Sequence, residues 1–269
     1  MAAPARAASP LPNSLMVFAG FLAISLLLPA CAFDVAHRLG RGETMAGAVA
    51  GLQSLATLLS RPWAGGQCDR LGAHVAVIRG FPLLLLGCGA AFLAGHLAGG
   101  PALALLALGR VPTGLGESLI LTGGMSWGMA RTGPAGSGKV IAWQGLAMFG
   151  AMVLGAPLGL WLVQSGIGPV ALAAGLAAGL GLGLALLVPG EAPVPGTPLN
   201  LREVVRLIGA HGPVLALAGT PYALINAFLG LWFVAMGWAG KEWALALFGI
   251  AFVIVRLVGA GWPSRYGAV

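Results

Sequence analysis

Runs of apolar residues, each close to the length of a membrane-spanning helix, recur along almost the whole of this chain. A helix needs about 20 mostly apolar residues to cross a bilayer. Hydrophobic residues make up 58% of the sequence and charged residues only 8%, whereas roughly a quarter of a soluble domain is charged. Such a chain cannot cover a surface that faces water. The sequence therefore predicts an all-α integral membrane protein whose main partner is the lipid bilayer.

Eight candidate spans follow from hydropathy, with boundaries good to a few residues. They are predicted at residues 15–36, 45–64, 74–97, 102–126, 139–163, 168–188, 210–234 and 243–262. After residue 188 comes a long Pro-rich polar segment, which is typical of a linker between two helix bundles. We therefore expect an N-terminal six-helix bundle over residues 1–188, a cytoplasmic linker over 189–209 and the start of a second bundle over 210–269.

The basic residues are scattered singly through the loops and decide which way the predicted bundle faces. Ten of them fall on one set of termini and loops and three on the opposite set. Because cytoplasmic loops carry the excess of Lys and Arg, we expect the N-terminus and the linker in the cytoplasm. The formal net charge is +7, but without a basic run the sequence does not indicate binding to nucleic acid. The Cys and His spacing predicts no metal site.

A charged, glycine-rich segment separates the second and third predicted spans and recurs near the end of the chain. The first copy runs from Arg61 to Gly72 and the second from Arg256 to Gly267, an offset of 195 residues. Each copy is expected to form a polar turn that acts as a conformational hinge, as in a transporter built from two related halves. The alternative is that its charges merely solvate a tight turn. The expected hinge residues are Arg61, Gly65, Gly66, Asp69, Arg70 and Gly72, with Arg256, Arg265 and Gly267 in the second copy.

Three segments resemble motifs of the major facilitator superfamily of transporters. The Gly65–Gly72 turn resembles the first motif of that superfamily, and a degenerate second copy follows the eighth span. The run Gly109–Gly124 resembles the fourth-helix motif, which places an arginine inside the membrane. The run Gly145–Gly159 resembles the Gly-Pro motif in the fifth helix of proton antiporters. As a whole, the chain is most similar to bacterial members that export sugars or drugs.

The resemblance implies a secondary transporter of the bacterial inner membrane that works by alternating access. It favours proton-coupled export of a small sugar-like or drug-like molecule by a monomer, with no cofactor. The family has twelve helices, whereas this chain ends after eight predicted spans, and the 195-residue offset implies a complete length of about 390 residues. We therefore expect a chain truncated after the eighth helix. An inactive fragment, a symporter and a uniporter are the alternatives.

An enzyme is not expected. The sequence has no phosphate-binding loop of the GxxxxGK(S/T) type, so ATP is not expected to drive the protein directly. An integral-membrane enzyme would need a nucleophile, a metal cluster or paired carboxylates at one membrane depth. Glu117 has no acidic neighbour in its span, which argues against that chemistry.

Glu117 lies in the middle of the fourth predicted span and is the first candidate for proton coupling. An ionised carboxylate there costs at least a few kcal/mol, so it should be neutral, paired or facing a cavity. Arg110 lies seven residues earlier, about 10 Å away along the same face, where its charge can tune the carboxyl across physiological pH. The alternatives are a buried structural pair or a hydrogen bond to backbone. Asp34, near the outer end of the first span, is a weaker proton-coupling candidate and equally consistent with an interface role.

Polar amides inside the spans are candidates for binding a polar substrate, although they serve equally well as hydrogen-bonding links between helices. The predicted cavity residues are Gln53, Gln144 and Asn226. In the fifth span, glycines and a proline predict a thin, bent and closely packed seam, with generic membrane-helix packing as the alternative. That seam comprises Gly150, Gly155, Pro157 and Gly159.

Overall fold

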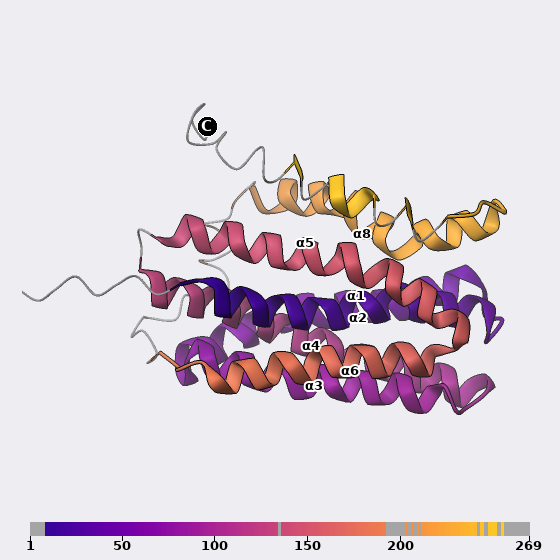
Figure 1. The fold of residues 1–269 in the computed structure, drawn as a ribbon, viewed down its shortest axis with the longest axis horizontal. Coiled ribbons are helices and arrows are strands. Elements are labelled where there is room, and N and C mark those ends of the chain that lie inside the picture. The colour runs from indigo at the N-terminus through magenta and orange to yellow at the C-terminus, as the bar shows by residue number, and fades with distance from the viewer. Residues whose placement is uncertain are drawn as a thin grey trace, which may run out of the picture.

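The fold is known from a computed structural model. It describes residues 9–133, 136–191 and 211–240, together with shorter pieces at 203, 206, 209, 243–244, 247–251 and 254–255. Throughout these residues the regular structure is helical, and the long helices run lengthwise beside one another (Figure 1). This arrangement agrees with the predicted all-α membrane bundle.

Seven long helices make up the described fold. They are α1 (Leu11–His37), α2 (Gly42–Leu71), α3 (Ala73–Ala94), α4 (Gly99–Thr132), α5 (Ser137–Leu162), α6 (Ile167–Leu187) and α8 (His211–Ala235), with a short 3-10 helix, η2 (Val163–Ser165), after α5. Each of the first seven predicted spans falls on one of them. The eighth, 243–262, lies largely outside the described residues. By length and composition, five described helices can cross a membrane, namely α1, α3, α4, α5 continued through η2, and α6.

The break between α2 and α3 is much shorter than the sequence indicated. An extended polar turn was expected over residues 65–72, but α2 stays helical through Gly65, Gly66 and Asp69 as far as Leu71. Only Gly72 leaves the helical conformation, with φ 97° and ψ 146°, a region that a side chain disfavours. Its N–H donates to the Cys68 carbonyl at 3.0 Å and so closes the end of α2. The expectation of a long turn was wrong, and the break between the two helices is a single residue.

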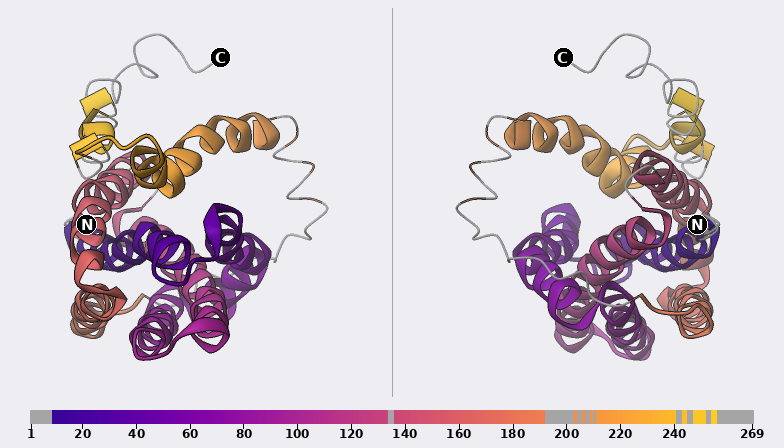
Figure 2. Two further views of the ribbon diagram at one scale, coloured as in Figure 1. Left: turned by 90° about the vertical axis from the view of Figure 1, so that its right-hand side faces the viewer. Right: turned by 90° about the vertical axis from the view of Figure 1, so that its left-hand side faces the viewer.

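Helix α1 lies at the centre of the bundle. It packs against α5 and α6 and also against α2 and α4, and most of its length is buried. Viewed end-on, α8 lies to one side of the six preceding helices (Figure 2), where it contacts α1 and α2. Large apolar side chains are exposed elsewhere on the bundle, among them Leu59, Leu176 and Leu187 at 71–81%. Such a surface suits lipid rather than water.

Helices α3 and α4 pack most tightly, at two pairs of glycines spaced seven residues apart on each helix. A Cβ on Gly80 would lie 2.9 Å from the Gly116 carbonyl oxygen, and a Cβ on Gly116 would lie 2.6 Å from the Gly80 carbonyl oxygen. Seven residues further along the same interface, a Cβ on Gly87 would lie 2.9 Å from the Gly109 carbonyl oxygen. The two backbones therefore touch, as small residues permit in membrane helices. This glycine seam was not predicted from the sequence.

The seam predicted in α5 lies against α1. A Cβ on Gly155 would lie 3.2 Å from a carbonyl oxygen of α1, and a Cβ on Gly159 would lie 3.1 Å from a Cα of α1. At Gly150 the nearest atom would be 3.8 Å away, which is ordinary contact. Pro157 lies within the helix, which runs unbroken from Ser137 to Leu162.

Candidate functional site

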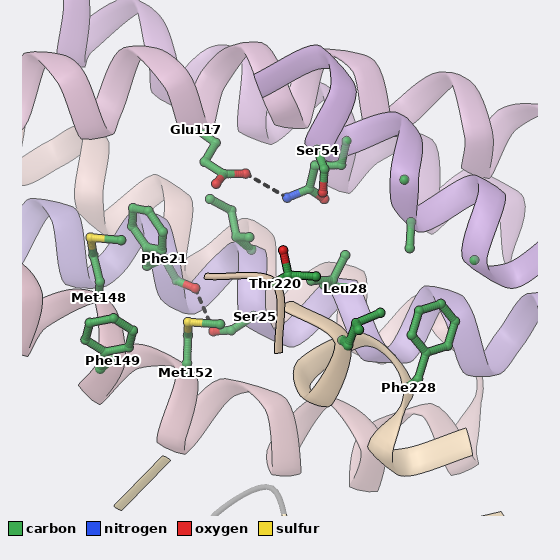
Figure 3. Close-up of a pocket in the computed structure, with 16 residues that line it drawn as sticks. Phe21, Ser25, Leu28, Ser54, Glu117, Met148, Phe149, Met152, Thr220 and Phe228 are labelled. Carbon is green, nitrogen blue, oxygen red and sulfur yellow. Dashed lines mark hydrogen bonds between the residues drawn. The ribbon is translucent and has the colours of Figure 1, made fainter. Parts of the chain in front are cut away.

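A cavity of about 540 Å³ lies where α8 meets α1, α2, α4 and α5. Its volume falls within the range of about 300–1,000 Å³ typical of small-molecule sites. Most of the side chains around it are apolar (Figure 3). The lining residues are Phe21, Ile24, Ser25, Leu28, Gly47, Ala50, Gly51, Gln53, Ser54, Glu117, Met148, Phe149, Met152, Thr220, Leu224 and Phe228.

Glu117, on α4, is the one charged side chain among the described residues that line this cavity. Its Oε2 accepts hydrogen bonds from Gln53 Nε2 at 2.9 Å and from Thr57 Oγ1 at 3.2 Å, both on α2. Figure 3 shows the first of these bonds, with Thr220 of α8 on the facing side. The second oxygen, Oε1, receives no hydrogen bond from the part of the chain that the structure describes. The carboxyl thus has one oxygen fixed by α2 and one left for a ligand or a proton.

Arg110 is fully buried, and Gln53 links it to the carboxyl. The guanidinium Nη1 donates to Gln53 Oε1 at 3.1 Å, while the amide nitrogen of the same side chain donates to Glu117. The orientation of that amide follows from this hydrogen-bond network. Nε and Nη2 of Arg110 have no partner among the described residues. The two charges lie on one helix, as predicted, and the group between them is the Gln53 side-chain amide.

The other two amides predicted for the cavity are not brought to it by the described structure. Gln144 is buried against Gly124, where a Cβ would lie 3.1 Å from its Nε2. Neither end of its amide has a hydrogen-bond partner among the described residues. Asn226 lies within α8, but its side chain falls outside the described residues. Of the three predicted amides, the structure therefore places Gln53 alone at the cavity.

The aromatic and sulfur-containing lining was not predicted. Met148, Phe149 and Met152 form one turn of α5, and Phe21 and Phe228 approach from α1 and α8 (Figure 3). The only signal was the helical spacing of Met148 and Met152, which is equally common where a helix packs against protein or lipid.

The described residues of the predicted hinge lie at one end of the bundle. Asp69 and Arg70 are exposed on the last turn of α2, and Gly65 and Gly66 are half-buried. Arg61 reaches α4, where its Nη1 donates to Thr122 Oγ1 at 3.4 Å. Within the described residues the structure gives Asp69 no ion pair. The second copy of the segment, with Arg256, Arg265 and Gly267, lies outside the described residues.

Asp34 lies in the last turn of α1 and forms an ion pair. Its two carboxylate oxygens accept from Nε and Nη2 of Arg38, each at 2.7 Å. The same guanidinium donates to the carbonyls of Leu97, at 2.9 Å, and Ala94, at 3.3 Å, at the end of α3. A cation is favourable there because helix carbonyls end without partners and the helix dipole is negative. The hydrogen bond with Asp34 raises the pKa of Arg38, so the guanidinium that clamps α1 to α3 stays charged.

We expect Arg38→Leu to destabilise the protein by about 1–3 kcal/mol, because it leaves the buried Asp34 carboxylate without its partner. Adding Asp34→Asn to that variant should restore part of the stability, since the unpaired charge is removed. Thermal unfolding of the purified protein in detergent measures both effects. Arg41→Leu is the control, because Arg41 is exposed on the same loop. Equal losses for the two single arginine variants would contradict the clamp.

The family model and the individual relatives that match this chain all indicate the same family. The sequence model of the family described as Major Facilitator Superfamily matches residues 14–269. The chain is 36% identical over 261 residues to "Uncharacterized MFS-type transporter STM4428" of Salmonella typhimurium, covering 94% of this chain and 66% of that protein. It is 38% identical over 262 residues to "Uncharacterized MFS-type transporter YhhS" of Escherichia coli, covering 94% of this chain and 63% of that protein. The chain thus spans just under two thirds of the length of these relatives.

Proposed function

Because this chain belongs to the Major Facilitator Superfamily, a family of membrane transporters, we propose that it serves in secondary active export of a small molecule in exchange for protons. Transport would occur by alternating access between the bundle of residues 1–188 and the bundle that begins at residue 210, with 189–209 as the linker. The position of the cavity supports this proposal, because α8 follows the linker whereas the other lining helices precede it.

The observation that carries the proposal is a carboxyl group in a largely apolar cavity. At this depth in a membrane an ionised Glu117 costs at least a few kcal/mol unless a proton or another cation accompanies it. Opening the cavity to one side of the membrane hydrates the carboxyl and lets its proton leave. Opening it to the other side lets a proton return. A carboxyl with alternating access is what proton coupling requires.

Gln53 would tie the protonation of Glu117 to the position of α2. Its amide holds the carboxylate through the nitrogen and Arg110 through the oxygen. A proton on Glu117 weakens the first bond, because a neutral carboxyl accepts more weakly than a carboxylate. Arg110 would then act through this amide, and a shift of α2 against α4 would change both contacts together.

The remaining roles follow the same scheme. We propose Gly72 and the neighbouring charges of α2 as the hinge, and the α5 glycines as a sliding contact with α1. Asp34 remains a proposed proton-coupling residue, with the clamp to Arg38 as its structural alternative. The distribution of basic residues supports a cytoplasmic N-terminus in a bacterial inner membrane. We propose that the carrier is monomeric and uses no cofactor.

Proteoliposomes that contain a trapped pH dye test the proposal. An imposed proton gradient should be dissipated faster when one member of a panel of sugars, uncharged drugs and cationic drugs is added. The substrate should move against its own gradient only while the proton gradient lasts, and an uncoupler should stop that movement. Uphill flux that survives the uncoupler would reject proton coupling. Protons and substrate moving in the same direction would indicate symport.

A further inference from the structure

We infer that the substrate is an amphipathic organic monocation, with a positive charge that pairs with Glu117 and an apolar body of drug-like size. This inference rests on the proposed transport function and names the chemistry of its cargo. It follows from the charge of the cavity, from the residues that line it and from the requirement that a proton and the substrate bind to Glu117 alternately.

The charge of the cavity favours a cation. Glu117 is the charged group among the described lining residues, and its Oε1 receives no hydrogen bond from them. Arg110 is fully buried and does not line the cavity, because Gln53 stands between it and the carboxyl. An anion would meet the Glu117 carboxylate first and would reach the guanidinium only by displacing that amide. A cation meets an oppositely charged group directly.

The walls favour an apolar body over a sugar. Aromatic rings of Phe21, Phe149 and Phe228 and the thioethers of Met148 and Met152 line the cavity. Aromatic faces attract cations, and methionine side chains adapt to apolar shapes. A sugar would instead need several polar partners for its hydroxyls.

Few hydroxyl groups lie in the wall, and one of them is already engaged within the protein. The Ser25 hydroxyl already donates within the protein, and lies 2.6 Å from the Phe21 carbonyl oxygen and 3.1 Å from that of Ala151. Hydroxyl groups in the lining otherwise come from Ser54 and Thr220. The cavity therefore offers more apolar contact than hydrogen bonding.

Proton and cation would compete for one carboxyl. Arg61 of α2 acts on Glu117 electrostatically, and Arg110 of α4 is connected to it through the Gln53 amide. Helices α1, α5 and α8 contribute no titratable side chain to the described lining. Binding of the cation and binding of a proton to Glu117 therefore exclude each other. One carboxyl then exchanges one proton for one monovalent cation.

A pair of probes with the same shape and opposite charge tests this inference. Tetraphenylphosphonium is a permanent cation, and tetraphenylborate is an anion of nearly the same size. Equilibrium dialysis with the purified protein in detergent should give at least tenfold tighter binding of the cation. Lowering the pH should weaken that binding, because protons compete for the carboxyl. Glu117→Gln should remove both the preference and the pH dependence, whereas Glu43→Gln, at an exposed glutamate of α2, should change neither.

The outcomes separate the substrate class from the transport function. Equal binding of the two probes, or tighter binding of the anion, would overturn the cation assignment even if proton-driven flux of another compound is found. Selective cation binding that Glu117→Gln leaves unchanged would also overturn it. Cation binding that depends on Glu117, in a protein that moves no protons, would support the site and reject the proposed transport. A melting temperature for Glu117→Gln close to that of the parent protein shows that lost binding is not unfolding.

Discussion

Glu117→Gln is expected to abolish proton-driven transport while leaving the protein folded. The amide keeps the size of the carboxyl and can still accept from Gln53 and Thr57, so the contacts between α2 and α4 persist. It cannot bind and release a proton, so the cavity loses the group proposed to couple the two fluxes. Substrate-dependent dissipation of a proton gradient in proteoliposomes should fall to the level of empty vesicles, at every pH between about 6 and 8.

Two further variants show whether this loss is specific. Asp34→Asn removes the carboxylate that forms the ion pair with Arg38. If Asp34 only clamps α1 to α3, that variant should melt at a lower temperature and keep its pH-dependent flux. If Asp34 relays protons, its flux should lose pH dependence as well. Unchanged pH dependence in Glu117→Gln would remove Glu117 from the mechanism.

Gly116→Val is expected to prevent assembly of the bundle. Its Cβ would lie 2.6 Å from the Gly80 carbonyl oxygen and 3.1 Å from the Leu84 nitrogen. Both are backbone atoms, so no side chain can rotate away to make room. Overpacking a core usually costs about 1–3 kcal/mol, and a clash between backbones should reach or exceed the upper end of that range. Size-exclusion chromatography of detergent-solubilised protein should show loss of the monodisperse peak.

Gly179→Val is the matched control, on α6. A Cβ there meets nothing within 4 Å, and the residue is exposed. The same substitution should therefore leave the elution profile and the melting temperature nearly unchanged. If both valine variants behave alike, close packing of α3 on α4 does not hold the fold together.

The apolar runs were enough to predict where most helices lie, because span length and hydrophobicity are local properties of the sequence. The end of α2 was predicted poorly. Gly65, Gly66 and Asp69 are turn residues in water-soluble proteins, but glycine is well tolerated in membrane helices, and α2 continues through all three. The α3–α4 seam was missed for a different reason. Which of the 45 glycines meet one another depends on how the helices cross.

The candidate site was predicted in part. Glu117, Arg110 and Gln53 stand out because a polar side chain in an apolar helix is costly and needs a reason. Their connection through one amide depends on the register between α2 and α4, which the sequence does not reveal. Gln144 has the same sequence pattern as Gln53 but is buried against Gly124. The ring and thioether lining, including Phe149, resembles any lipid-facing or core segment until the helices are placed together.

The contact between α3 and α4 has a consequence for how such a carrier would move. Helices α3 and α4, whose backbones touch at Gly80 and Gly116 and again at Gly87 and Gly109, are expected to move as one rigid unit. Both Arg110 and Glu117 lie on α4 in that rigid unit, so the distance between the two residues would stay constant through a transport cycle. Motion that exposes the carboxyl would then come from the two helices that face it, namely α2, whose Gln53 amide donates to Glu117, and α8, on the other side of the cavity.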